Sequence, residues 1–304
     1  MNRRRVKSKS RSVVRYMCML WMANALVMMM AGCDTPPEES PSAIELHSAS
    51  DKVPSSIEND EPSILQLVSP VSAENGEQLA AAGRIVGTVK FNGQVPELPP
   101  LIKKGDDNAK DPAICAAADI PDQSLLVNEA AGNGLANVFV YMLKAPKTLR
   151  VPVPDEPLIM DQKGCVFMPH AMLVRTGQRV LVLSDDDTAH NVHTFPIRNQ
   201  PINSLMAPND RVGLELIYSR SEPSPIAVKC DVHSWMTAYH LVLDHPFTAL
   251  TDHEGKFEIP GMPAGTHKLR VWHERAGILD RDIEIVIKQD ETSEMTLEYP
   301  ASRF

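Results

Sequence analysis

The sequence predicts an all-β protein of two β-sandwiches, preceded by a disordered N-terminal tether. Prolines outnumber glycines 25 to 15, which favours extended segments and turns over long helices. Short runs of alternating apolar and polar residues recur from Gly83 onward with turn residues between them, and no stretch has the periodicity of a long helix. Short strands separated by turns are typical of β-sandwiches, and 304 residues suffice for two of them.

The strand pattern begins with alternation over 83–91, closed by the turn Asn92-Gly93, and continues with a buried run at 137–143. The segment 96–133 is otherwise irregular, with one short candidate strand at 124–127. Further strands are expected at 166–168, 172–175, 179–183, 212–218, 225–230, 240–243, 256–259, 267–272, 283–287 and 295–299.

The first 32 residues have the features of an export signal. Seven basic residues and no acidic one precede the apolar run 16–30, and Ala31-Gly32-Cys33 follows it. A cysteine directly after Ala-Gly resembles the bacterial lipobox, which implies a lipid on Cys33. An uncleaved membrane anchor, or an ordinary signal cut near Cys33, is the alternative. All three interpretations place the body of the protein outside the cytoplasm, in the periplasm or at the cell surface.

Residues 33–82 are acidic and rich in Pro and Ser, a composition that cannot bury a core. We therefore expect a solvated tether there. Without residues 1–32 the chain keeps 23 basic and 39 acidic residues, a formal net charge of −16. Such a chain repels nucleic acid, so nucleic-acid binding is excluded as a function.

The five cysteines divide by position. Cys18 lies in the signal and Cys33 at the lipobox, whereas Cys115 and Cys165 are the natural disulfide candidates in an oxidising compartment. Cys230 remains unpaired. A lone exported thiol is a hazard unless something occupies it.

The most informative segment is 229–236, in which Cys230, His233 and Met236 lie within seven residues. A thiolate, an imidazole and a thioether form a soft ligand set that suits copper. A second imidazole is available from His190, in the run 189–193.

This pattern resembles the cupredoxin family of blue copper proteins, in particular the amicyanin-like members. The Cys-x-x-His-x-x-Met loop and the His-Asn-Val-His run match over residues 160–245, although Val182 and Ser184 depart from the family pattern. The resemblance implies a Greek-key sandwich with one mononuclear copper site. The implied ligands are His190, Cys230, His233 and, axially, Met236. Asn191 would join the two ligand loops by hydrogen bonds, and the ring edge of His233 would be the electron port.

Two alternatives concern the metal. Zinc can use a Cys-x-x-His pair, but it seldom takes a thioether, and the upstream histidine would be unexplained. A metal-free cupredoxin fold would not need all four ligand types. His170 and His193 are expected to be surface or hydrogen-bonded histidines rather than ligands.

A second resemblance covers the flanks. The strand-turn-strand pattern over 251–272, with the strands at 87–91 and 137–141, is similar to carboxypeptidase regulatory-like, or transthyretin-like, sandwiches of immunoglobulin-like architecture. We therefore expect a discontinuous sandwich from 83–150 and 246–300, with the cupredoxin domain at 151–245 inserted into it. Two tandem domains are the alternative.

Together these observations predict a membrane-anchored blue copper protein that carries electrons between redox partner proteins and is not an enzyme. Two other hypotheses use the same sequence. The first is copper capture or delivery through the same four ligands. The second is a metal-independent surface lipoprotein with a structural or carbohydrate-binding role, based on the flanking sandwich. Nothing in the sequence identifies the partner proteins.

Overall fold

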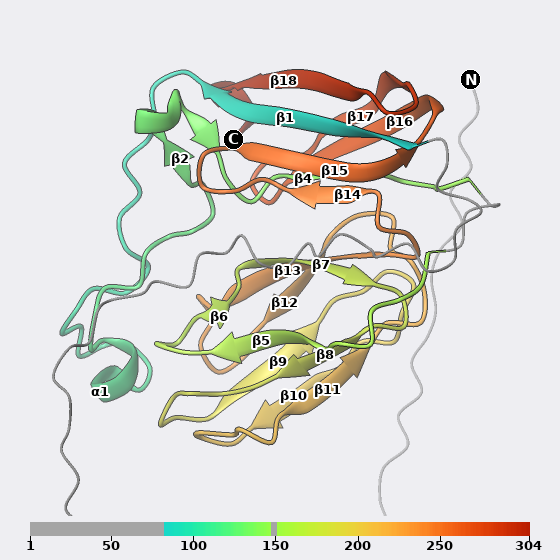
Figure 1. Cartoon of the computed structure of the whole chain (residues 1–304). Helices are drawn as coiled ribbons and strands as arrows, with labels where there is room; N and C mark the ends of the chain where they lie inside the picture. Colours follow the sequence, from blue (N-terminus) through green and yellow to red (C-terminus); the bar gives the residue numbers. More distant parts are fainter. Residues whose placement is uncertain (1–81, 147–150) are drawn as a thin grey trace, which may run out of the picture. The chain divides into compact units, whose positions relative to one another are not determined.

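The computed structural model describes residues 82–146 and 151–304, which form β-strands with very little helix (Figure 1). The predicted all-β class is confirmed. The predicted signal peptide (1–32), the tether (33–82, apart from Ala82) and Cys33 lie outside the described residues. Among the helices in the described ranges, none has the length and apolar character needed to cross a bilayer.

Two sheets form what we call the flanking sandwich. In the first sheet β1 (Ala82–Asn92) pairs antiparallel with β15 (Lys256–Pro263) and β3 (Gly134–Leu135) and parallel with β18 (Thr292–Pro300), and β3 pairs with β2 (Val127–Asn128). The second sheet has the order β14 (Thr248–Leu250), β4 (Phe139–Met142), β16 (Gly265–His273) and β17 (Gly277–Ile287). Each sheet thus combines strands that precede and follow residues 151–245 (Figure 1).

Two further sheets form what we call the site sandwich. One has the order β10 (Asn203–Met206), β9 (His190–Thr194), β12 (Ile226–Lys229), β13 (Thr237–Leu243) and β7 (Ala171–Arg175). The other has the order β11 (Leu214–Ile217), β8 (Arg179–Val182), β5 (Leu158–Gln162) and β6 (Phe167–Met168). The parallel pairing of β13 with β7 and of β5 with β8 requires crossovers between the layers.

Each sandwich encloses its own apolar core, since one buried cluster joins side chains of both sheets in each case. In the site sandwich, alternation along β8 buries Val180 and Val182, which pack with Met160 of β5 and Val228 of β12. In the flanking sandwich, Ile85 and Val89 of β1 pack with Leu269 of β16. Period-two alternation in the sequence therefore corresponds to one buried face per strand.

The structure differs from the expected strands in several places. The candidate strand at 124–127 is wrong except at its end, since β2 begins at Val127. Strands β3, β5, β9, β10 and β14 were not predicted, and the irregular segment contains a four-residue helix, α1 (Pro112–Cys115). Two 3-10 turns complete the elements, η2 (Glu129–Ala131) and η3 (Ala301–Arg303). The missed strands are short, and β10 exposes its apolar Leu205, so its pattern does not show the usual alternation.

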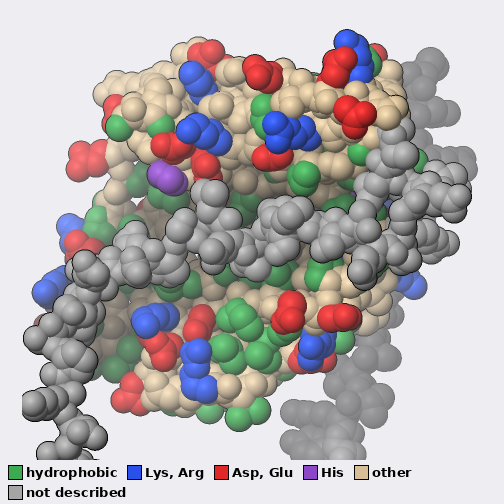
Figure 2. Space-filling view, viewed as in Figure 1, with side chains coloured by type: hydrophobic (Ala, Val, Ile, Leu, Met, Phe, Trp, Pro, Cys, Tyr) green, Lys and Arg blue, Asp and Glu red, His purple; other side chains and the backbone are tan. Residues whose placement is uncertain are grey.

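On the face shown in Figure 2, acidic and basic side chains are interspersed, while hydrophobic side chains gather over the sheet that contains β5, β8 and β11. Exposed apolar residues of that sheet include Ile159 and Ile217. This face therefore carries no extended field of one charge sign.

Candidate metal centre

The candidate centre lies where β9 and β12 run side by side. His190 is the first residue of β9, and Cys230 follows the last residue of β12. The antiparallel register pairs Lys229 with His193, which brings Cys230 alongside the beginning of β9. His233 and Met236 then lie in the turn between β12 and β13. Sheet pairing thus joins two segments that are 40 residues apart in sequence.

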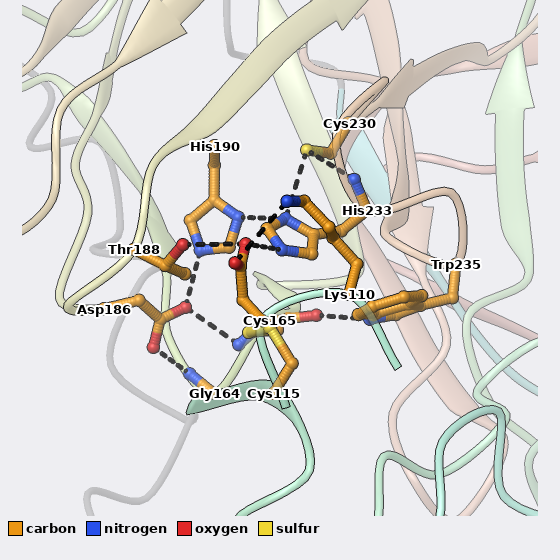
Figure 3. Close-up of a disulfide and its surroundings, with 11 residues drawn as sticks. Lys110, Cys115, Gly164, Cys165, Asp186, Thr188, His190, Cys230, His233 and Trp235 are labelled. Atoms are coloured by element: carbon orange, nitrogen blue, oxygen red, sulfur yellow. Dashed lines mark hydrogen bonds and ion pairs between the residues drawn. A yellow bond between two sulfur atoms is a disulfide. The ribbon is translucent and has the colours of Figure 1, made fainter. Parts of the chain in front are cut away.

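The side chains of His190, Cys230 and His233 converge, with one donor atom from each lying within 4.8 Å of the others. The two imidazoles face each other through their Nδ1 atoms at 2.9 Å, and Nδ1 of His233 lies 3.8 Å from the Cys230 sulfur (Figure 3). All three side chains are buried. The structure therefore brings together two nitrogens and one sulfur from the predicted set.

Met236 closes the ligand loop. Its amide donates to the His233 carbonyl at 3.0 Å, and its own carbonyl accepts from the Cys230 amide at 3.2 Å. The Met236 side chain is buried in the core of the site sandwich. These bonds hold the Cys-x-x-His-x-x-Met segment as one tight turn.

Each imidazole is held from its outer side by a carboxylate. Nε2 of His190 donates to Asp186 at 2.8 Å, and Nε2 of His233 donates to Asp111 at 3.0 Å. A carboxylate only accepts, so both outer nitrogens carry the proton. The inner Nδ1 atoms are then the ones that can act as metal donors, and carboxylate–histidine pairs of this kind orient metal ligands.

The Cys230 sulfur has the environment of a thiolate. Burial acts to raise its pKa, but hydrogen bonds from His190 and His233 and from the amides of Asn191 and His233 outweigh burial and lower the pKa to about 6. Both amides lie 3.4 Å from the sulfur. The thiolate is the form of cysteine that binds metals.

His190 shows the opposite shift. Burial acts to lower its pKa, but the bond to Asp186 and the neighbouring Cys230 raise it to about 9. An imidazole must be free of a proton at the nitrogen that binds a metal, so the raised pKa would make metal binding by His190 dependent on pH.

Asn191 joins the two ligand segments. Its side-chain oxygen accepts from the amides of Asp231 and Val232 at 2.5 and 3.3 Å, and its own amide points at the Cys230 sulfur. Its side-chain nitrogen donates to Asn203 at 2.7 Å. The role that the resemblance implies for Asn191 thus has a geometric basis here.

The disulfide lies next to the centre. Cys115 and Cys165 are bonded, with their Cα atoms 5.3 Å apart, and their sulfurs lie within 4.8 Å of a ring nitrogen of His233 (Figure 3). Trp235 donates from Nε1 to the Cys165 carbonyl at 3.0 Å, and its ring centre lies 5.2 Å from that of His233. The indole of the ligand loop thus contacts both the His233 ring and the backbone at the disulfide.

The ring edge of His233, which the resemblance implies as the electron port, is covered in the structure. The side chain has 0% exposure, because Asp111 and the residues around the disulfide cover its outer nitrogen. His193 is half-buried and pairs with Asp231 at 3.0 Å, and His170 pairs with Glu274 at 2.5 Å. Neither belongs to the donor cluster.

Sequence reasoning assigned no role to Asp111, Asp186 or Thr188. Asp186 precedes His190 by four residues, and that spacing to a candidate ligand was the available signal. Asp111 is 122 residues from His233 in the chain and is preceded by no recognisable motif. Only the tertiary structure shows that it supports the centre.

The residues present fit a single soft-to-borderline metal ion. Two imidazole nitrogens and a thiolate suit copper, and the two Nδ1 atoms face each other at 2.9 Å with the Cys230 sulfur beside them. Every donor also has a partner that holds it in place. The chemistry of the donor set therefore agrees with the predicted copper site.

No protein-family model matches the chain, and no curated protein matches it in sequence. Solved structures that match include a copper-containing nitrite reductase from Thermus scotoductus, with 13% identity over 32% of this chain and 24% of that chain and a TM-score of 0.26. A purple cupredoxin from Nitrosopumilus maritimus matches with 16% identity over 28% of this chain and 98% of its own, with a TM-score of 0.24. A reduced amicyanin variant matches with 17% identity over 30% and 85%, with a TM-score of 0.26. TM-scores this low do not assign a function.

Proposed function

We propose that the chain is a blue copper protein of the cupredoxin type that binds one copper ion and carries single electrons. His190, Cys230 and His233, together with Met236 of the same loop, would hold the ion. Copper bound there would alternate between Cu(II) and Cu(I) and so supply one electron at a time.

The observation that carries the proposal is the facing pair of imidazoles beside a thiolate. Both outer nitrogens are occupied by carboxylates, so the inner nitrogens of His190 and His233 can serve only a proton or a metal ion. The nearby Cys230 adds the soft ligand that distinguishes a copper site from a site for harder cations.

The surroundings favour electron transfer over copper delivery. The three donors are 0–2% exposed, and hydrogen bonds through Asn191 hold their two segments together. A delivery protein must release its ion, which requires an accessible or mobile ligand. A rigid, buried site instead changes little between the two oxidation states, so little reorganisation opposes the electron.

We further propose that the protein is exported, that lipid on Cys33 holds it at a membrane, and that it serves redox partner proteins there. The lipobox-like sequence and the basic, then apolar, N-terminus support this location. The Cys115–Cys165 disulfide supports an oxidising compartment.

The test is to load the full chain with Cu(II) and record its visible spectrum. We expect an intense band from charge transfer between the Cys230 sulfur and copper, lost in Cys230→Ser and His190→Gln. His253→Gln is the matched control, because His253 is an exposed histidine outside the donor cluster. Voltammetry should show a reversible one-electron couple. A colourless copper complex, or copper that exchanges freely without such a couple, would contradict the proposal.

A further inference from the structure

The outer edge of His233 is covered by a segment that the donor pattern does not include. We call residues 103–120, which contain α1, the cap. A β-bridge between Ile102 and Ile120 closes its two ends. Cys115, Ala116 and Ile120 of the cap are buried in the core of the site sandwich. The cap is therefore packed onto this sandwich as part of its core.

The cap is fastened beside the candidate centre. Its Cys115 is bonded to Cys165, and the Cys165 amide in turn donates to Asp186, the carboxylate that holds His190 (Figure 3). The Cys115 amide donates to the Asp111 carbonyl at 2.9 Å. One disulfide thus connects the supports of both imidazoles.

Asp111 makes the contact with His233. One of its carboxylate oxygens accepts from Nε2 of His233 and from Oγ1 of Thr188, both at 3.0 Å. Its backbone has φ +52° and ψ +57°, the left-handed region that costs a non-glycine residue free energy and persists only where surrounding contacts hold it. The two hydrogen bonds and the disulfide one helical turn away are contacts of that kind.

The two carboxylates differ in exposure. Asp186 is buried, with a side chain 6% exposed, whereas the Asp111 side chain is 32% exposed. A polar connection from the donor cluster to solvent therefore runs through His233 and Asp111. The cap keeps this polar connection to solvent, but it closes direct access of reactants to the His233 ring.

We propose that Asp111 is a positioning residue that fixes the tautomer and orientation of His233, and that the cap which carries it limits electron exchange at the His233 ring edge. This inference rests on the proposed electron-transfer function. Movement of Asp111 away from the ring would give reactants direct contact with its outer nitrogen.

Three variants of the full chain test the proposal. Asp111→Ala removes the contact and opens the ring edge, Asp111→Asn removes the charge but keeps an acceptor, and Thr188→Val releases the carboxylate without changing it. Asp107→Asn is the control, because it removes an exposed carboxylate of the same cap. The reduced copper form of each is mixed in stopped flow with an anionic and a cationic one-electron oxidant, hexacyanoferrate(III) and tris(phenanthroline)cobalt(III).

In each reaction one electron passes from the protein to the oxidant. We expect Asp111→Ala to accelerate both reactions about tenfold, because exposure helps either reactant. Loss of charge alone, as in Asp111→Asn or Asp107→Asn, should accelerate the anionic oxidant and slow the cationic one. Thr188→Val should show a smaller acceleration of both. If Asp111→Ala instead reacted faster than the control with one oxidant and slower with the other, the effect would be one of charge alone. That result would overturn the role of the cap.

A second readout needs no copper. Nitrogen NMR of the metal-free protein should show His233 protonated at Nε2 in the parent chain and in Asp111→Asn, but distributed over both nitrogens in Asp111→Ala. An unchanged tautomer in Asp111→Ala would overturn the positioning role. This result is independent of the visible spectrum, so failure of the copper function and failure of the Asp111 inference remain distinguishable.

Discussion

The flanking sandwich and the site sandwich achieve stability in different ways. In the flanking sandwich β1 and β17 each have 11 residues, whereas the longest strand of the site sandwich, β13, has 7. Of the 13 buried polar side chains in the described residues, 11 lie between residues 162 and 245. The flanking core is thus nearly all apolar, while the site core includes much of the polar machinery of the centre.

The comparison shows how polar burial is compensated. A buried polar group costs free energy unless it is hydrogen-bonded. His190, Asp186 and Asn191 each have specific partners, and the disulfide adds a covalent constraint that the flanking sandwich lacks in its described part. The flanking sandwich instead depends on long ladders and hydrophobic contact.

The largest expected effect tests the flanking sandwich alone. Ile259→Ala deletes a fully buried side chain of β15 and should reduce the free energy of unfolding by about 2–5 kcal/mol. Denaturant unfolding followed by circular dichroism measures it. Val286→Ala, at a 58% exposed position of β17, should stay within about 0.5 kcal/mol of the parent. A change of the copper spectrum in Ile259→Ala would show that packing in the flanking sandwich also affects the copper site.

The next effect compares one histidine in each sandwich. Burial lowers the pKa of His240 in the site sandwich to about 4, and burial, aided by Arg275, does the same for His273 in the flanking sandwich. The unfolded chain takes up protons near pH 6.5, where the folded chain does not. Stability present above pH 6.5 should therefore be lost as the pH falls toward 4, by on the order of 3 kcal/mol per histidine.

Unfolding curves between pH 7 and 4 measure this loss, and His240→Gln or His273→Gln should each flatten the slope. His253→Gln, at an exposed position, is the control and should leave the slope unchanged. Equal slopes in all variants would mean that neither buried ring controls acid stability.

The smallest expected effect sharpens the comparison at the centre itself. Asp186→Asn removes the charge that holds Nε2 of His190 and that accepts from the amides of Gly164 and Cys165. Loss of such an outer support should weaken copper binding by about 10–100-fold. Competition with a chromophoric chelator measures the affinity. Asp187→Asn, at the exposed neighbouring position, should leave it unchanged, and an equal loss in both variants would argue against a specific role of Asp186.

Local pattern was a good guide wherever the structure depends on neighbours in the chain. The alternation over 83–91 predicted a strand, and β1 forms there. The closely spaced Cys230, His233 and Met236 lie in one hydrogen-bonded turn. Short strands such as β10 and β14 were missed, because two or three alternating residues do not exceed what a loop shows by chance. Apart from Cys115, whose disulfide with Cys165 was predicted, the segment 96–133 gave no sign of its role.

The amino-acid sequence by itself determined the all-β character and the chemical types of the proposed donors, since both follow from residue identity and short spacing. The tertiary structure alone decided that His233 is buried and that Asp111 holds it. The physical reason is that this contact joins residues 122 positions apart through a disulfide-anchored segment, and no local periodicity encodes such a closure.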